Sequence, residues 1–158
     1  MNAFTISRQA IDMTEFRASL EDTSCGACVI FEGLVRNHNE GRAVSRLAYE
    51  AYEPLAVKEG EVIMQEAMQR FEINRVRAIH RHGELDLTEP AVVVGVSSAH
   101  RDAAFRACRY IIDEIKHRLP IWKKEYYADG TTEWVNCQQC AELHGPQEST
   151  PAVKPPFP

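Results

Sequence analysis

The chain has 158 residues, enough for one domain with a sizeable core, and its 44% hydrophobic and 26% charged residues are typical of a globular protein. A net charge of −5 argues against broad binding to nucleic acid or to anionic membranes. The sequence has no apolar run of membrane-spanning length and no signal pattern at its N-terminus, and its five cysteines are an odd number. We therefore expect a cytoplasmic protein in a reducing compartment.

The first half of the chain predicts short elements around one polar loop. We expect a strand at residues 4–6, a helix at about 14–20 and a buried strand at 27–35. Residues 36–42 include no apolar side chain and contain turn-forming Asn and Gly, so this loop should be exposed and mobile. A strand at 44–52 follows, and Pro54 can begin a helix with one core-facing stripe.

The second half continues the alternation of strands and helices within one compact domain. Strands are expected at 75–80 and at 91–97, where a near-continuous apolar run predicts burial on both faces. Residues 121–127 and 132–135 should form a hairpin around Asp129-Gly130. The long helix at 101–118 is expected to bury a stripe of large side chains. These are Phe105, Cys108, Ile112, Ile115 and Leu119.

The C-terminal stretch is expected to be a tail rather than part of the domain. Residues 144–158 hold five of the chain's eight prolines and few apolar groups, which is typical of a disordered segment. The domain is therefore expected to span residues 1–143.

Cationic side chains stand at two strand ends. His100 and Arg101 follow a buried strand and begin a helix, where free backbone N–H groups and the helix dipole favour an anion such as phosphate. A merely solvated arginine and a histidine that caps the helix are the alternatives at this junction. Arg36 ends another buried strand, which is where rigid scaffolds present binding groups.

Two lysines flank a forced helix end. Lys116 lies in the last turn of the long helix, Pro120 stops that helix, and Lys123 follows on a strand, so two amines should converge near one bend. A solvated lysine face is the alternative. On the strand, Lys123 and Glu125 share a face, so Glu125 can hold Lys123 in place.

Metal binding is a weaker interpretation of two further patterns. Cys25 and Cys28 form one CxxC pair and Cys137 and Cys140 another, and four thiolates could hold a structural zinc ion. The two pairs lie more than a hundred residues apart, so small buried or surface thiols are favoured. The run from 80 to 82 places two histidines on one strand face without an acidic or cysteine ligand at supportive spacing, which favours a polar cluster at a strand end over a metal site.

Four blocks of sequence together resemble the large catalytic subunit of molybdopterin synthase in order and spacing. They cover about residues 25–135 and read GACVIFEGLVRNHNEGRAV, LAYEAYEPLA, IHRHGELDLTEPAVVVGVSSAHRDAAF and IDEIKHRLPIWKKE, the last followed by DGTTEWV. One departure follows Trp134-Val135, where this chain continues with Asn136-Cys137 and relatives often have a basic residue in the pocket.

The resemblance implies an α+β fold of the α/β hammerhead type and a homodimer core with a small ubiquitin-like sulfur-carrier subunit at each end of a heterotetramer. It also implies the reaction. The carrier's C-terminal Gly-Gly thiocarboxylate would sulfurate cyclic pyranopterin monophosphate twice and form the dithiolene of molybdopterin, with no metal or redox cofactor. The rival hypotheses are a zinc-stabilised binding module and a non-catalytic protein that binds a phosphoryl ligand.

The same resemblance assigns residues to a substrate pocket by motif. Lys116 is the candidate for proton transfer and Lys123 for orienting the thiocarboxylate or the phosphate, because ammonium groups can stabilise developing oxyanions and thiolates. Fixed cations for the cyclic phosphate would come from Arg36, His100 and Arg101. The remaining residues expected to line the pocket are Leu34, Val35, Lys124 and Glu125.

The length of the long helix limits how these residues can meet. Arg101 and Lys116 are fifteen positions apart, which corresponds to roughly 22 Å along a helix. A small pterin cannot span that distance. If both residues serve one substrate, His100 and Arg101 must come from the second chain of a homodimer.

Overall fold

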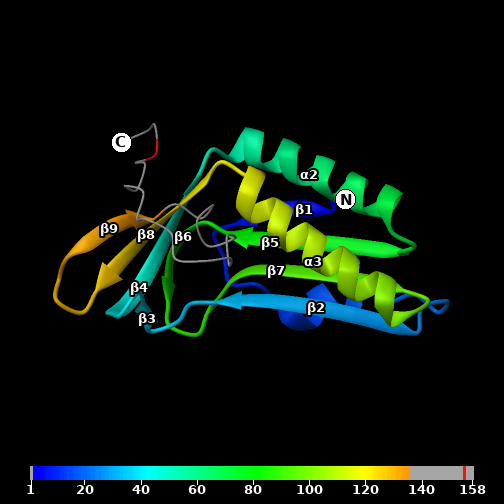
Figure 1. Cartoon of the computed structure of the whole chain (residues 1–158), viewed down its shortest axis with the longest axis horizontal. Coiled ribbons are helices and arrows are strands. Elements are labelled where there is room, and N and C mark those ends of the chain that lie inside the picture. The colour runs from blue at the N-terminus through cyan, green and yellow to red at the C-terminus, as the bar shows by residue number, and fades with distance from the viewer. Residues whose placement is uncertain (1, 136–154, 156–158) are drawn as a thin grey trace.

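The computed structural model describes residues 2–135 and residue 155, and arranges them around two β-sheets (Figure 1). The first sheet has the strand order β1-β5-β7-β2, and its only parallel pairing is that of β1 with β5. Among the described residues, β2 therefore has a neighbour on one side only. The four strands are β1 (Phe4–Ser7), β2 (Ala27–Leu34), β5 (Arg75–Arg81) and β7 (Pro90–Ser98).

The second sheet lies at one end of the first and is antiparallel (Figure 1). Its strand order is β3-β4-β8-β9, with β6 paired to β4. The chain enters this sheet from the C-terminal end of β2, so the last residues of β2 lie where the two sheets meet. The strands are β3 (His38–Asn39), β4 (Arg42–Ala51), β6 (Gly83–Asp86), β8 (Ile121–Tyr127) and β9 (Thr132–Val135).

Helices cover both faces of the first sheet. The long helices α2 (Glu53–Arg70) and α3 (Arg101–Arg118) pack against one face and form the main hydrophobic core. The short helix α1 (Met13–Ala18) covers the other face, where Phe16 and Leu20 pack against Ile79 and Val93. Residues 91–98 of β7 are all buried, which confirms the burial expected on both faces of this strand.

Local signals explain where the helices begin and end. The Asp12 side chain accepts a hydrogen bond from the Glu15 backbone N–H at 3.0 Å and caps α1. Pro54 lies in the first turn of α2, where its missing N–H costs nothing. Pro120 follows the C-cap of α3, so the helix ends as predicted and β8 begins at Ile121. No helix among the described residues is long and apolar enough to cross a membrane.

The α+β class and the order of the main elements are confirmed, and the structure corrects two predictions. Phe105 is 59% exposed rather than buried, because it lies about 100° around the helix from Ala104, which faces the sheet. The loop at 36–42 contains a small hairpin rather than a wholly irregular segment. Glu40 and Gly41 have positive φ values of 47° and 78° and form the tight turn that pairs β3 with β4.

Two elements complete the comparison with the predictions. Strand β6 was not expected, because only its pairing with β4 defines this four-residue segment. The hairpin around Asp129-Gly130 is confirmed, and Gly130 adopts a φ of 88°. The predicted tail at 144–158 lies outside the described residues except for residue 155.

Candidate functional site

A cavity of about 200 Å³ lies where the two sheets meet, and it gathers residues from six elements of the structure. The end of β2, the β3 hairpin, strand β4, the start of β7, the last turn of α3 and strand β8 all contribute to its wall. Five of the residues predicted from the sequence are among those that line it. They are Leu34, Arg36, Lys116, Lys123 and Glu125.

Glu125 is the centre of a hydrogen-bonded network beneath this cavity. Its side chain is only 1% exposed, and a carboxylate at that depth must be paired. It accepts a hydrogen bond from Asn39 Nδ2 at 2.9 Å and one from the Tyr127 hydroxyl at 2.8 Å, and it lies 3.3 Å from Lys123 Nζ. The predicted pairing of Lys123 with Glu125 is therefore confirmed, and the lysine is held at a defined point of the cavity wall.

The β3 hairpin ties Arg36 to the same network. Arg36 Nη2 donates to Asn39 Oδ1 at 3.1 Å, and Asn39 in turn donates to Glu125. Tyr127 also belongs to the network, because its hydroxyl donates to Glu125. Burial, followed by the hydrogen bond to Glu125, raises the pKa of Tyr127, so its hydroxyl remains a donor to the carboxylate.

Lys116 enters the cavity from the last turn of α3, and its ammonium group makes no hydrogen bond or ion pair with a described residue. The imidazole of His80 is buried, and its ring packs edge-on against Tyr49, which lines the cavity, at a centroid distance of 4.9 Å. Burial, and to a smaller extent the positive charge of Lys116, together lower the pKa of His80 to about 4. His80 is therefore neutral near pH 7, and its Nδ1–H donates to the Arg81 carbonyl at 2.8 Å.

The charges at the cavity do not balance. Three cationic side chains, Arg36, Lys116 and Lys123, face a single carboxylate, Glu125. Two of these cations thus lack a carboxylate partner among the described residues. Such an arrangement attracts an anionic group and can stabilise negative charge that develops during a reaction.

The structure does not bring the other four predicted residues into this cavity within one chain. Val35 is 2% exposed and belongs to the hydrophobic core. Lys124 points to the opposite face of β8 from its neighbours, and its Nζ lies 5.2 Å from the Tyr126 ring and 5.7 Å from the Trp134 ring. His100 and Arg101 are exposed at the start of α3, and the His100 side chain makes no capping hydrogen bond.

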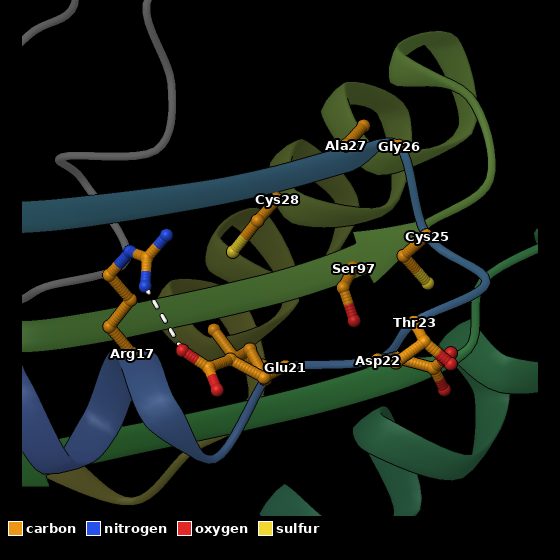
Figure 2. A pocket seen from close by; sticks show the side chains of 10 residues that line it. Arg17, Glu21, Asp22, Thr23, Cys25, Gly26, Ala27, Cys28 and Ser97 are labelled. Atoms are coloured by element: carbon orange, nitrogen blue, oxygen red, sulfur yellow. Dashed lines mark hydrogen bonds and ion pairs between the residues drawn. The ribbon is translucent and has the colours of Figure 1, made fainter.

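A larger cavity of about 590 Å³ lies at the N-terminal end of β2 (Figure 2). Figure 2 shows Cys25 in the loop before β2, Cys28 on the strand and Ser97 on the neighbouring β7. Among the residues that the structure describes, Arg17 is the only cation in the lining of this cavity, and it pairs with Glu21 at 3.3 Å. Burial raises the pKa of the Cys28 thiol, which therefore remains protonated. This cavity is bigger, but it presents neither an unbalanced cation nor an activated nucleophile.

The alternatives that involve metal find no cluster among the described residues. No group of three or more His, Cys, Asp or Glu side chains within residues 2–135 and 155 could hold a metal ion. Cys137 and Cys140, the second half of the zinc hypothesis, lie outside the described residues. Cys108 is buried at 4% exposure and packs in the core, as predicted. His82 is buried between Glu53 and Glu50, at 2.8 and 3.1 Å.

Three further residues belong to the site without having been predicted from the sequence: Asn39, Tyr49 and Tyr127. Tyr127 shares a strand face with Lys123 and Glu125, so the alternation along the strand could have identified it. Asn39 gave no such signal, because it lies in a polar loop and reaches Glu125 across 86 positions of the chain.

Comparisons with known proteins concern the family and the fold of this chain. A family model described as "MoaE protein" matches residues 6–118. The molybdopterin synthase catalytic subunit of Nostoc sp. is 38% identical over 142 residues, which cover 89% of this chain and 86% of that protein. The crystal structure of molybdopterin synthase from Staphylococcus aureus superimposes with a TM-score of 0.80 at 36% identity, covering 85% of this chain and 98% of that one.

A fourth comparison concerns an assembly. A chain in the complex of subunits 1 and 2 of molybdopterin-converting factor from Helicobacter pylori matches with a TM-score of 0.67 over 80% of this chain and 86% of that one. Its sequence identity is 21%, so this likeness shows the fold alone.

Proposed function

This chain belongs to the MoaE protein family, and from that premise we infer that it is the catalytic subunit of a molybdopterin synthase. Its activity is the transfer of sulfur from the C-terminal thiocarboxylate of a small ubiquitin-like carrier subunit to cyclic pyranopterin monophosphate. Two transfers form the dithiolene of molybdopterin. The observation that carries this proposal is the cavity in which Arg36, Lys116 and Lys123 surround the buried carboxylate of Glu125.

The chemistry of sulfur transfer needs the residues that the cavity presents. The substrate carries a phosphate, which Arg36 can bind, since a guanidinium matches phosphate oxygens in shape and charge. In each transfer a carbon–sulfur bond to the pterin forms while a carbon–oxygen bond at the same pterin carbon breaks, and that oxygen leaves as water or as the opened phosphate ester. The acyl–sulfur bond of the carrier is then hydrolysed. Water supplies the oxygen that replaces sulfur, so the carrier leaves as a carboxylate.

The two lysines have different roles in this scheme. Lys116 has no hydrogen-bond or ion-pair partner among the described residues, so its ammonium group is available to donate a proton or to stabilise the oxyanion that develops on the acyl group. Lys123 is held by Glu125 at 3.3 Å and orients the thiocarboxylate or the phosphate from a fixed position.

The carrier reaches this site with its flexible C-terminal Gly-Gly tail. A cavity of about 200 Å³ accepts a backbone without side chains more readily than a bulky segment. Extending the carrier by one residue beyond its terminal glycine should therefore abolish transfer. Undiminished transfer from the extended carrier would refute the threading of the tail.

His100 and Arg101 complete the phosphate site from a second copy of the chain. α3 is one continuous helix from Arg101 to Arg118, so these residues cannot reach the cavity of their own chain. Mixing Lys116→Ala and Arg101→Ala chains tests this arrangement. Shared pockets leave one site of the mixed dimer intact and should restore activity, whereas no recovery despite verified chain exchange would refute the shared site.

The decisive test of the function is reconstitution. The purified chain is incubated with a thiocarboxylated carrier and cyclic pyranopterin monophosphate, and the dithiolene product is followed by mass spectrometry. The matched control is the same carrier ending in an ordinary carboxylate, which has no sulfur to give. The proposed reaction takes place in the cytoplasm, because an odd number of cysteines fits a reducing compartment better than a set of disulfide bonds. Binding of the pterin without any product would instead support a non-catalytic protein.

A further inference from the structure

The Glu125 carboxylate divides its two oxygens between different donors. Asn39 Nδ2 donates to Oε1 at 2.9 Å, and the Tyr127 hydroxyl donates to Oε2 at 2.8 Å. Lys123 Nζ lies 3.3 Å from Oε1, which is longer than the roughly 2.7–2.9 Å of a tight hydrogen bond between an ammonium group and a carboxylate. The two neutral donors therefore hold the carboxylate more closely than the lysine does.

This division of contacts determines where the Lys123 ammonium group lies. Glu125 is 1% exposed, and a carboxylate at that depth must be compensated by donors or by a cation. Because Tyr127 and Asn39 supply two donors, Lys123 does not have to close onto the carboxylate. Its ammonium group then keeps its place in the wall of the cavity instead of turning inward.

The Tyr127 hydroxyl has a second carboxylate within reach. Glu133 Oε2 lies 3.4 Å from it, against 2.8 Å for Glu125 Oε2, and a hydroxyl has one proton to donate. Arg42 decides between the two acceptors. Its Nη1 lies 3.0 Å from Glu133 Oε1, and its guanidinium stacks over the Tyr127 ring with Cζ 3.5 Å from the centroid. Arg42 thus compensates Glu133 and holds the ring in place, so the hydroxyl donates to Glu125.

We propose that Tyr127 is a positioning residue for sulfur transfer, because its hydroxyl holds the Glu125 carboxylate and so keeps Lys123 directed into the cavity. Arg42 acts one step further away by keeping that hydroxyl directed at Glu125. Burial, together with the hydrogen bond to Glu125, raises the pKa of Tyr127, so the hydroxyl keeps its proton and remains a donor. This inference rests on the proposed function, which places Lys123 beside the thiocarboxylate or the phosphate.

Removal of one hydroxyl tests this role in the reconstituted reaction with the thiocarboxylated carrier. Tyr127→Phe keeps the ring and removes the donor to Glu125, so the buried carboxylate draws Lys123 inward. The kcat for sulfur transfer should fall by about 10-fold, while KM for the pterin stays within about twofold because Arg36 is unchanged. Tyr126→Phe is the matched control, since Tyr126 points to the opposite face of β8, and it should leave kcat unchanged.

A double-mutant cycle separates positioning from a general structural effect. In a chain that already carries Lys123→Ala, Tyr127→Phe should cause no further loss, because the group that it positions is gone. The same loss of about 10-fold in both backgrounds would overturn the proposal, as would an unchanged kcat in Tyr127→Phe alone. Melting temperatures measured alongside show whether each variant is folded at the temperature of the assay.

The role of Arg42 has a test of its own. Arg42→Met removes the charge that compensates Glu133, so the Tyr127 hydroxyl turns toward Glu133 and kcat should fall several-fold. Adding Glu133→Gln to this variant should restore most of the rate, because a neutral amide is a weaker acceptor than a carboxylate. No recovery in the double variant would overturn the role of Arg42.

A measurement without substrate distinguishes this inference from the proposed function. Trinitrobenzenesulfonate labels lysine amines, and mass spectrometry gives the labelling rate of Lys123 relative to that of Lys58, which is exposed on α2. Tyr127→Phe should lower this ratio several-fold, since Lys123 is drawn against Glu125. Tyr126→Phe should leave the ratio unchanged. An unchanged ratio in Tyr127→Phe would overturn the positioning even in an active enzyme, whereas the expected ratio in a chain that transfers no sulfur would refute the function and leave the positioning of Lys123 standing.

Discussion

The two cavities at opposite ends of β2 differ in a way that size does not reveal. The larger, at about 590 Å³, has one cation, Arg17, which is already paired with Glu21. The smaller, at about 200 Å³, has three cations around one carboxylate. Uncompensated charge is costly to keep near a protein interior, so its presence points to a ligand, whereas empty volume alone does not. Substitutions in each of the two cavities can test this difference.

The largest effect is expected at Lys116. Lys116→Ala should lower the rate of sulfur transfer by about 100- to 1,000-fold, the usual loss when one group that stabilises a transition-state charge is removed. Its ammonium lies at the edge of the core rather than within it, so the far-ultraviolet circular dichroism spectrum and the melting temperature should stay close to those of the wild type. Near-normal turnover in this variant would exclude a catalytic role.

A smaller loss of rate is expected at Lys123. Lys123→Ala should reduce sulfur transfer by about 10- to 100-fold, because it removes an orienting group and leaves the proton donor in place. Glu125 keeps its hydrogen bonds from Asn39 and Tyr127, so the variant should still fold. Steady-state kinetics of the two lysine variants side by side provide the measurement. A loss of folding at either position would favour a structural role.

The stability of the fold should also depend on pH through His80, which is buried against Tyr49 of the small cavity. The pKa of His80 in the folded state is about 4, below the usual value of 6.5. Between these two pH values the unfolded chain binds a proton at His80 that the folded chain does not bind. The stabilisation is present above pH 6.5 and is lost as the pH falls toward 4, with a slope of at most about 1.4 kcal/mol per pH unit.

Urea unfolding of the wild type and of His80→Asn between pH 7 and pH 4.5 measures this contribution. The variant should be less stable at pH 7, because it alters a buried position, but its stability should fall less steeply with acid. Parallel curves for the two proteins would contradict the assignment.

The smallest effect is expected in the large cavity. Arg17→Ala removes its only lining cation and an exposed ion pair, which should change the free energy of unfolding by less than about 1 kcal/mol and leave sulfur transfer unchanged. This variant is the matched control for the lysine substitutions. A loss of activity comparable to that of Lys123→Ala would mean that charge balance does not distinguish the two cavities.

The sequence by itself determined the local features of this protein. Apolar runs, prolines and turn residues predicted most strands and helices, because these signals act between near neighbours in the chain. The alternation along β8 was enough to pair Lys123 with Glu125, and the sequence blocks identified the family and the three cations of the cavity. Helix length was enough to separate Arg101 from Lys116.

Only the tertiary structure decided which distant segments meet. The contact of Asn39 with Glu125 spans 86 positions of the chain, and the pairing that creates β6 exists only against β4. The exposure of Phe105 likewise depends on where α3 lies on the sheet. Helical periodicity defines the apolar stripe of a helix but not how much of that stripe the sheet covers. Such contacts are non-local, and no pattern of neighbouring residues encodes them. The position of β2 at one end of the order β1-β5-β7-β2 belongs to the same class, because it exists only once the order of the strands is known.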